Sequence, residues 1–321
     1  MIEVTGLSKK YGKHLAVDNV SFSIKKGEIV GFLGPNGAGK STIMNILTGY
    51  ISSTSGSVLI DGFDILEQSE HAKKRIGYLP EIPPLYPDMT VREYLYFIYD
   101  LKKVKFPKKP HIDEILGLVK IDDVANRLIK NLSKGYRQRV GIASALVGNP
   151  DVLILDEPTV GLDPKQIIEI RELISKLGKN HTVILSSHIL SEIQAVCEKI
   201  IIINGGKLIA NDTAENLSNN LSSDRSLIVR VVGEEQEVIK ILQSVKGVDS
   251  VKSLGKQESN AYDYLLTPQD NTDIRATVFE RLSERNKTLL SMQSNALTLE
   301  QIFLRLTDAT AQINLPNGEE E

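Results

Sequence analysis

One stretch constrains this chain more than any other: residues 34–42, which fit the pattern G-x-x-x-x-G-K-[ST]. In such a loop, glycines tolerate φ > 0 and backbone N–H groups converge on phosphate oxygens. An apolar run at 28–33 precedes the loop and an amphipathic run at 41–47 follows it, as expected for a strand and a helix. The sequence therefore predicts that phosphate is bound by Gly34, Pro35, Asn36, Gly37, Ala38, Gly39, Lys40, Ser41 and Thr42.

The order strand, loop, helix also assigns individual tasks within this predicted site. A helix that begins directly after the loop directs its free N–H groups and partial positive charge at the phosphates. Lys40 is then expected to reach the β- and γ-phosphates, and the Ser41 hydroxyl to bind Mg²⁺. Tyr11, in a turn at residues 11–13, is expected either to stack on a nucleotide base or simply to pack against the protein.

Composition and length set the class of protein. The 321 residues predict two domains, and the 41% apolar and 25% charged fractions are ordinary for a globular chain rather than a disordered or membrane-embedded one. No apolar run approaches the ~20 residues that a membrane-spanning helix needs. The absence of a leader pattern predicts a cytoplasmic location. A net charge of −3 gives no reason to expect a nucleic-acid partner.

The first two thirds of the chain predict three kinds of structure. A β-rich part is expected to contain strands near 2–4, 21–24, 56–62 and 75–81. A helical subdomain is expected at about 91–144, with helices at 91–101, 112–118 and 136–144. The aromatic residues of its first helix are expected to fill the subdomain core or to form a docking surface. The basic run at 102–110 is interpreted as a solvated loop, with an anionic lipid or acidic partner as the alternative.

Two later apolar runs are each followed directly by ionisable side chains. The run at 151–155 is followed by Asp156 and Glu157, and the run at 182–187 by His188. Strands that alternate with helices predict a parallel sheet, whose carboxyl ends form the usual ligand crevice. Asp156 and Glu157 are therefore expected to be placed for work on metal and water.

The last third predicts a separate small domain. A polar segment at 218–225 is interpreted as a linker, and 226–312 as an accessory or regulatory α+β domain. Its element order, β-α-β-β-α-β, suggests a ferredoxin-like unit, for which dimerisation, regulation and simple stabilisation of the first domain all remain open. A closing helix is expected at 297–306, and a flexible acidic tail at 313–321.

Four features follow one another in the chain: the loop at 34–42, the sequence Leu-Ser-Lys-Gly-Tyr-Arg-Gln-Arg at 132–139, the sequence Asp-Glu-Pro at 156–158, and His188. Together they resemble the ATP-binding subunit of an ABC transporter, over roughly residues 1–217. The sequences at 77–81 and 132–136 are most similar to those of an exporter branch that includes drug, sodium and gliding-motility-associated ATPases. The resemblance implies an α/β P-loop NTPase of the ABC ATPase type, with a β-rich subdomain, a parallel RecA-like sheet and a helical subdomain.

The resemblance also implies residue roles. Ser133 and Gly135 would contact the γ-phosphate of ATP held by a second, antiparallel copy of the chain, and Asp163 would link the two sites. A plain helix cap is the other interpretation of Ser133. Here Lys134 stands where the family usually has a second glycine, and Tyr136 where it usually has glutamine.

The remaining implied roles concern the metal and the attacking water. Asp156 would hold Mg²⁺, and Glu157 would be the base that orients or deprotonates water. His188 would donate to the γ-phosphate, although a lone histidine at a strand end is often structural. Glu81 replaces the usual glutamine of a metal-sensing loop, so it can accept a hydrogen bond or approach Mg²⁺ but cannot donate.

The resulting functional prediction is an ATP-binding and hydrolysing subunit that powers export with a separate integral membrane permease. It would be held at the cytoplasmic face of the membrane through that permease. The alternative is a permease-independent ATPase of the same type that acts as a nucleotide-gated regulatory or assembly factor. A regulator that does not hydrolyse ATP is a third possibility, which Glu157 disfavours.

Overall fold

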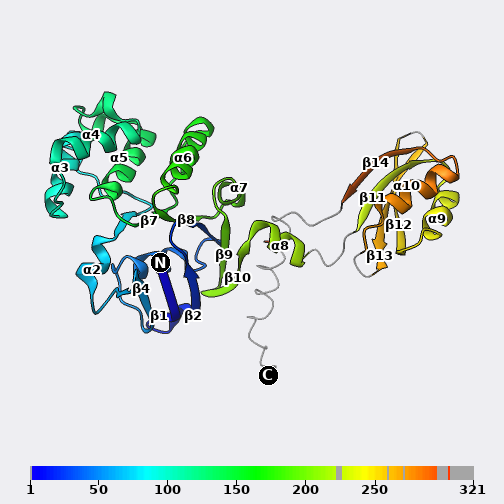
Figure 1. Ribbon diagram of the computed structural model, residues 1–321, viewed down its shortest axis with the longest axis horizontal. Helices are drawn as coiled ribbons and strands as arrows, with labels where there is room; N and C mark the ends of the chain where they lie inside the picture. Colours follow the sequence, from blue (N-terminus) through cyan, green and yellow to red (C-terminus); the bar gives the residue numbers. More distant parts are fainter. Residues whose placement is uncertain (1, 222–225, 259, 270–271, 295–302, 304–321) are drawn as a thin grey trace, which may run out of the picture. The chain divides into compact units, whose positions relative to one another are not determined.

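The computed structural model describes residues 2–221, 226–258, 260–269, 272–294 and 303 (Figure 1). Contacts divide the chain into two units, and the division falls between Ala214 and Glu215. The strands of the first unit are β1 (Ile2–Tyr11), β2 (His14–Ile24), β3 (Ile29–Leu33), β4 (Ser55–Ile60), β5 (Phe63–Asp64), β6 (Ile76–Leu79), β7 (Val152–Asp156), β8 (Thr182–Ser187), β9 (Lys199–Asn204) and β10 (Lys207–Thr213). Its helices are α1 (Lys40–Leu47), α2 (Ser69–Lys74), α3 (Val91–Leu101), α4 (Lys108–Leu118), α5 (Lys134–Leu146), α6 (Pro164–Leu177) and α7 (Leu190–Gln194).

A mostly parallel sheet carries the functional part of this unit. Its strand order is β10-β9-β3-β8-β7-β6, in which only β10 pairs antiparallel with its neighbour. Every residue of β3, β7 and β8 is buried. Continuous burial of this kind is typical of parallel strands covered on both faces. The predicted parallel sheet is confirmed, and Asp156 lies at the carboxyl end of β7 as expected.

One strand was assigned to the wrong sheet. β6, from the run at 75–81, pairs in parallel with β7 at the edge of the central sheet and does not belong to the β-rich part. Gly77 explains the placement, because a Cβ there would lie 2.2 Å from the Ala145 carbonyl oxygen. The missing side chain lets α5 lie directly on β6. The sheet that the strand joins is decided by its pairing with the distant strand β7, which its local pattern does not encode.

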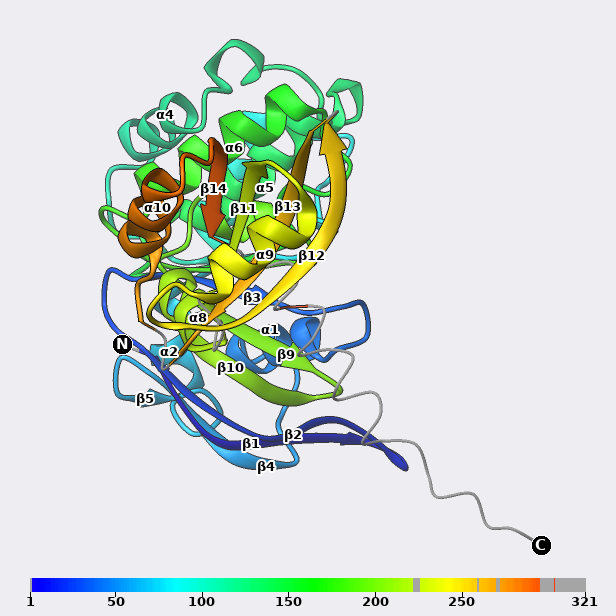
Figure 2. The same ribbon diagram turned by 90° about the vertical axis from the view of Figure 1, so that its right-hand side faces the viewer.

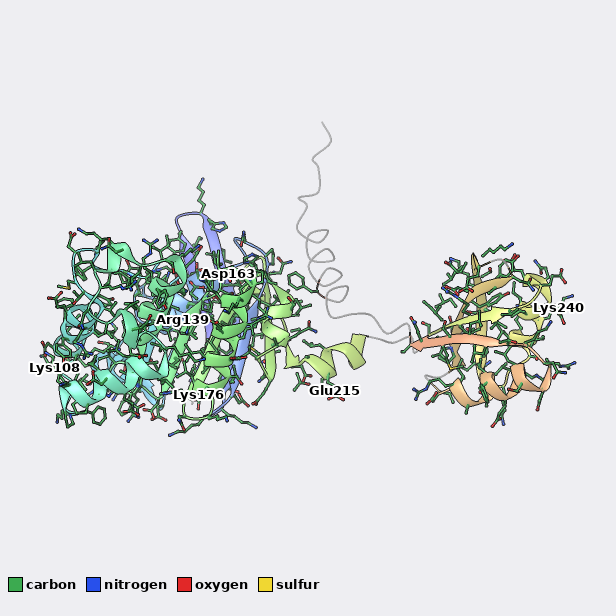
Figure 3. All side chains as sticks on the ribbon, turned by 90° about the horizontal axis from the view of Figure 1, so that it is seen from above. Lys108, Arg139, Asp163, Lys176, Glu215 and Lys240 are labelled. Carbon is green, nitrogen blue, oxygen red and sulfur yellow. The ribbon has the colours of Figure 1, made fainter. Side chains whose placement is uncertain are left out.

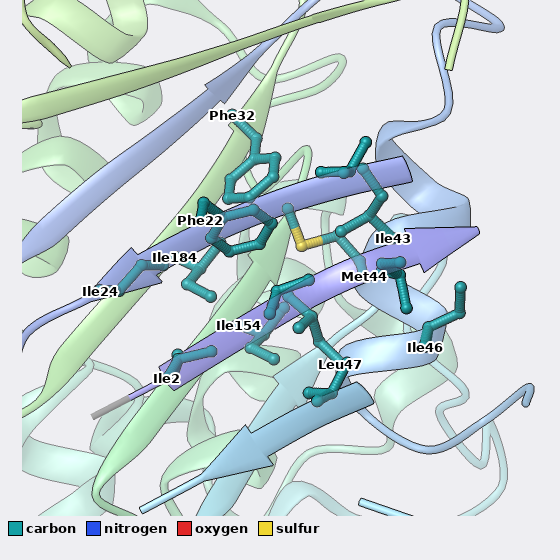
Figure 4. Packing of buried hydrophobic residues seen from close by; sticks show 14 of the residues in the cluster. Ile2, Phe22, Ile24, Phe32, Ile43, Met44, Ile46, Leu47, Ile154 and Ile184 are labelled. Carbon is teal, nitrogen blue, oxygen red and sulfur yellow. The ribbon is translucent and has the colours of Figure 1, made fainter. Parts of the chain in front are cut away.

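The β-rich part is an antiparallel sheet of order β2-β1-β4-β5 (Figure 2). β1 and β2 are much longer than predicted and meet in a hairpin whose last pair is Tyr11 and His14. The inward faces of this sheet, the central sheet and α1 share one buried cluster, part of which appears in Figure 4. Within it, the rings of Phe22 and Phe32 contact edge to face with centroids 5.3 Å apart. This shared core fixes the phosphate loop, which lies between β3 and α1.

The helical subdomain contains α3, α4, α5 and two short 3₁₀ helices, Asp122–Val124 and Ile129–Asn131. α3 begins at a capping box, in which the Thr90 side chain and Glu93 satisfy each other's backbone N–H groups. Of the aromatic residues of α3, Tyr94 and Tyr99 are buried, as expected for a subdomain core, whereas Phe97 is exposed. A docking surface on this helix stays a prediction.

The basic run is not a simple solvated loop. Its residues from Lys108 onward form the first turn of α4. Lys102 donates to three backbone carbonyls at the end of α5, those of Ser144, Ala145 and Val147. Burial lowers the pKa of Lys102 to about 8. Since cations stabilise helix C-termini, this lysine caps α5 rather than facing solvent.

The second unit has the predicted order: β11 (Leu227–Val232), α9 (Glu235–Gln243), β12 (Val248–Glu258), β13 (Ala261–Pro268), α10 (Arg275–Glu284) and β14 (Leu289–Ser294). Its antiparallel sheet has the order β12-β13-β11-β14, with a separate apolar core (Figure 1). The order β-α-β-β-α-β with the first and third strands in the middle is that of a ferredoxin-like unit.

The segment that joins the units differs from the prediction. Residues 218–221 of the predicted linker belong to a helix, α8 (Ala214–Leu221), and residues 222–225 lie outside the described residues. The closing helix predicted at 297–306 falls largely outside the described residues, and the acidic tail at 313–321 entirely so. Among the described helices, none is long and apolar enough to cross a membrane.

Candidate active site

The phosphate loop has the geometry that its glycines predict. Gly37 and Gly39 have φ of 79° and 105°, in the region that L side chains avoid. A Cβ on Gly39 would also lie 2.7 Å from the Ala16 carbonyl oxygen. No side chain caps the N-terminus of α1, which begins at Lys40. Its first N–H groups are therefore available to an anion.

Lys40 lies folded over the loop. Its Nζ donates to the carbonyl oxygens of Gly34 at 2.8 Å and Pro35 at 3.3 Å, and lies 3.9 Å from Glu157 Oε1. Burial lowers the pKa of Lys40, and the carboxylates of Glu157, Asp156 and Glu81 act in the opposite direction. The ammonium group is thus held over the loop by two backbone carbonyls and one carboxylate.

The two strand ends meet where the sequence predicted. Both Glu157 carboxylate oxygens contact His188 Nδ1, at 3.0 and 3.1 Å. The Ser186 hydroxyl donates to Asp156 and accepts from the Glu157 backbone N–H, which joins the ends of β7 and β8. Glu157 has φ of 48°, a strained value for a residue with a side chain. Such strain is typically kept at functional sites.

The environment of Glu157 sets its protonation. Only 7% of the residue is exposed. Burial is the largest influence and raises the pKa of Glu157, whereas the contact with His188 and the charge of Lys40 act to lower it. A carboxylate with a raised pKa is a better proton acceptor than an ordinary surface glutamate.

These residues line one cleft of about 640 Å³. Its wall includes Tyr11, residues 36–42, Glu81, Glu157 and His188. Gly34 and Pro35 lie behind it as partners of Lys40, and Asp156 lies buried beneath Glu157. The cleft has the size of a nucleotide site and places an aromatic ring at one end and a carboxylate beside the phosphate loop.

Three predicted site residues lie elsewhere. Ser133 and Asp163 are exposed helix caps. Ser133 accepts from Tyr136 N at the start of α5. Asp163, labelled in Figure 3, accepts from Gln166 N at the start of α6. Gly135 is packed against the side chain of Gln166, which a Cβ would meet at 2.6 Å. None of the three lines the cleft of about 640 Å³. α5 begins at Lys134, two residues before the predicted start near Tyr136.

Sequence reasoning missed several residues of the site. His14, Ala16 and Val160 also line the cleft. The position of His14 could have been found, because it pairs with Tyr11 across the predicted turn. The bridging role of Ser186 depends on the neighbouring strand β7, for which the local sequence holds no signal.

Comparison with known proteins agrees with this geometry. Residues 17–160 match the family described as ABC transporter. The linearmycin resistance ATP-binding protein LnrL of Bacillus subtilis (strain 168) is 33% identical over 97% of this chain and 99% of its own length. The bacitracin transport ATP-binding protein BcrA of Bacillus licheniformis is 43% identical over 65% of this chain and 68% of its own.

A solved structure is also similar. It is a dimeric, post-hydrolysis ATP-binding cassette bound to ADP and Pi, with 29% identity and a TM-score of 0.61 over 66% of this chain and 98% of that one. The fold and site thus define a P-loop ATPase of the ABC type. This chain belongs to the ATP-binding subunits of ABC transporters, and it is an ATP-binding ATPase whose relatives fit the exporter branch.

Proposed function

We propose that this chain binds ATP with Mg²⁺ in the cleft, pairs head to tail with a second copy, and powers export through a separate integral membrane permease. The observation that carries the proposal is the meeting of Lys40, Glu157 and His188 in one cleft. Two further points support a shared site. Ser133 and Gly135 do not line the cleft of their own chain, and the similar solved cassette is a dimer.

Each residue then has a task that its position supports. Lys40 and the N-terminus of α1 bind the phosphates, and Tyr11 stacks on adenine. Glu157 accepts the proton of the attacking water, and His188 orients Glu157 and donates to the γ-phosphate. Ser133 and Gly135 of the second copy close the site over the γ-phosphate, with Asp163 near the junction between the copies.

The residues present fit Mg²⁺. The ion prefers oxygen ligands and takes few from the protein, the rest coming from phosphate and water. Ser41 and Glu81 line the cleft and supply a hydroxyl and a carboxylate, and the buried carboxylate of Asp156 is close enough to act on the charge of Lys40. In the described part of the chain, no group of three His, Cys, Asp or Glu residues could hold a metal by itself. The ion, when bound, would neutralise phosphate charge.

Partners outside the chain follow from the family. The relatives LnrL and BcrA are named for resistance to linearmycin and transport of bacitracin. Export of an antimicrobial compound is therefore the transport reaction that we propose. The permease would hold this subunit at the cytoplasmic face of the membrane.

The test is Glu157→Gln, which keeps the shape of the side chain and removes the base. We expect phosphate release to fall by about 10²-fold or more, a loss typical of a general base, while ATP still binds and the protein elutes as a stable dimer in ATP. Glu172→Gln, on the exposed face of α6, is the matched control and should behave as the wild type. Equal phosphate release from Glu157→Gln and wild type, or a monomer at all ATP concentrations, would contradict the proposal.

A further inference from the structure

A buried carboxylate lies behind the pair formed by Glu157 and His188. Glu192, in α7, is only 4% exposed. Its Oε2 accepts two hydrogen bonds, from the Thr159 hydroxyl at 2.6 Å and from the Ser187 hydroxyl at 2.8 Å. Both donors are buried as well. Burying a carboxylate is costly unless it is hydrogen-bonded, so this arrangement is a specified part of the fold.

The two donors belong to the two segments that carry the catalytic pair. Thr159 lies two residues after Glu157 in the loop that follows β7, and Ser187 directly precedes His188 at the end of β8. The Ser187 hydroxyl also accepts from Ile189 N at 3.0 Å, which fixes the turn after His188. One carboxylate oxygen therefore joins both segments at a point where a small shift would change the spacing between Glu157 and His188.

The helix that carries Glu192 is itself held in place by packing against the central sheet. Its neighbour Ile193 is fully buried against β3. A Cβ on Gly31 would lie 2.3 Å from Ile193 Cγ2, so the glycine lets α7 approach the central sheet. The helix that carries Glu192 is thus anchored to β3, independently of the two loops that Glu192 joins.

We propose that Glu192 is a positioning residue for ATP hydrolysis, which sets the distance between Glu157 and His188 by holding Thr159 and Ser187 on one oxygen. The inference rests on the roles proposed above for Glu157 and His188. Two charge-assisted hydrogen bonds define the relative position of two loops better than either could alone. Misplacement of a reacting group by about 1 Å can cost about 10²-fold in rate.

Three variants of the full chain test this positioning role. Thr159→Val and Ser187→Ala each remove one donor, and Glu192→Gln keeps an oxygen that accepts both. We expect kcat to fall by about 10-fold or more in the first two and by less in Glu192→Gln, while KM and the Kd for ATP change less than about threefold. Thr182→Val is the matched control: its hydroxyl is equally buried but accepts from Gly27 N at the opposite end of β8. Its kcat should stay near that of the wild type.

A double-variant measurement separates positioning from general stabilisation. If Thr159 acts through the catalytic pair, Thr159→Val should cause little further loss of single-turnover hydrolysis in a chain that already carries Glu157→Gln. Additive losses, or losses that follow ATP affinity and the thermal midpoint, would overturn the inference, as would a kcat equal to that of Thr182→Val. Wild-type hydrolysis by Glu157→Gln alone would instead overturn the proposed base, and the inference with it.

Discussion

At the scale of single residues, Glu157 is governed by opposing influences. Burial raises its pKa, while His188 and Lys40 favour the ionised form but do not outweigh burial. The fold therefore disfavours the ionised side chain relative to the unfolded chain. The buried carboxylate and the positive φ of Glu157 both cost stability. Such costs are typical of a residue that is retained for its chemistry.

This predicts how stability depends on pH. Because the pKa of Glu157 is raised in the folded state, its contribution to stability is present below the ordinary value near 4.5 and is lost as pH rises through the folded-state pKa. Without nucleotide, Glu157→Gln should thus raise the free energy of unfolding of the first unit at pH 8 and leave it nearly unchanged at pH 4. Urea titrations at the two pH values measure the difference. A variant less stable than wild type at pH 8 would refute the expected sign.

Tyr11 gives a second prediction at this scale. Its ring is 48% exposed and lines the cleft, and nearby Lys9 lies 5.2 Å from the ring centroid. Stacking of a base on an aromatic ring is worth about 1–3 kcal/mol. We expect Tyr11→Ala to weaken ATP binding by about 10-fold, and Tyr11→Phe to leave it nearly unchanged, in equilibrium titrations of nucleotide. Equal affinity of the alanine and wild-type proteins would mean that Tyr11 only packs against the hairpin.

At the scale of elements, the carboxyl ends of β7 and β8 build the catalytic pair, and close approach of helices to strands holds those ends in place. α5 lies on β6 over Gly77, and α7 lies on β3 over Gly31. Both glycines occur where a Cβ would collide with the neighbouring element. These contacts fix α5 against β6 and α7 against β3, the strands that pair with β7 and β8.

A pair of glycines tests this packing argument. Gly77→Ala would bring Cβ within 2.2 Å of a backbone oxygen, so we expect a loss of about 1–3 kcal/mol or more in the free energy of unfolding. Gly117→Ala, inside α4 with no atom near the new Cβ, should instead gain up to about 1 kcal/mol. Denaturant titration of both variants gives the comparison. Similar effects at the two positions would contradict the packing argument.

One wrong prediction and one missed network show that local sequence patterns do not encode contacts between distant parts of the chain. The strands β3, β7 and β8 could be predicted because continuous burial leaves an apolar run in the sequence. β6 has a similar run, but its sheet is decided by pairing with β7, more than seventy residues away in the chain, which local patterns do not encode. The Glu192 network was missed for the same reason, since its donors come from two separate loops.

At the scale of the whole molecule, the nucleotide cleft belongs to the first unit alone. All residues that line it lie between Tyr11 and His188. The match to the similar dimeric cassette takes in 98% of that cassette but only 66% of this chain. The cassette is therefore about as long as the first unit alone. LnrL, in contrast, matches along 97% of this chain. The ferredoxin-like second unit is thus an addition to a complete ATPase cassette, which we propose to be accessory or regulatory.

If two copies share each ATP site, variants with defects in different halves of the site should complement each other. Lys40→Met disables the phosphate loop, and Ser133→Asp places a negative charge where the second copy would contact the γ-phosphate, while remaining a good cap for α5. Each variant alone should be inactive, because every site then contains one defective half. A mixed dimer contains one intact site, in which the Ser133→Asp copy supplies the phosphate loop and the Lys40→Met copy supplies Ser133.

The measurement is phosphate release from the two variants, separately and mixed in equal amounts. We expect the mixture to hydrolyse ATP much faster than either variant alone. As a control, an equal mixture of wild type and Glu172→Gln should hydrolyse ATP at the same rate as either of these proteins alone at the same total concentration. A mixture no more active than its components, although mixed dimers form, would show that each chain completes its own site.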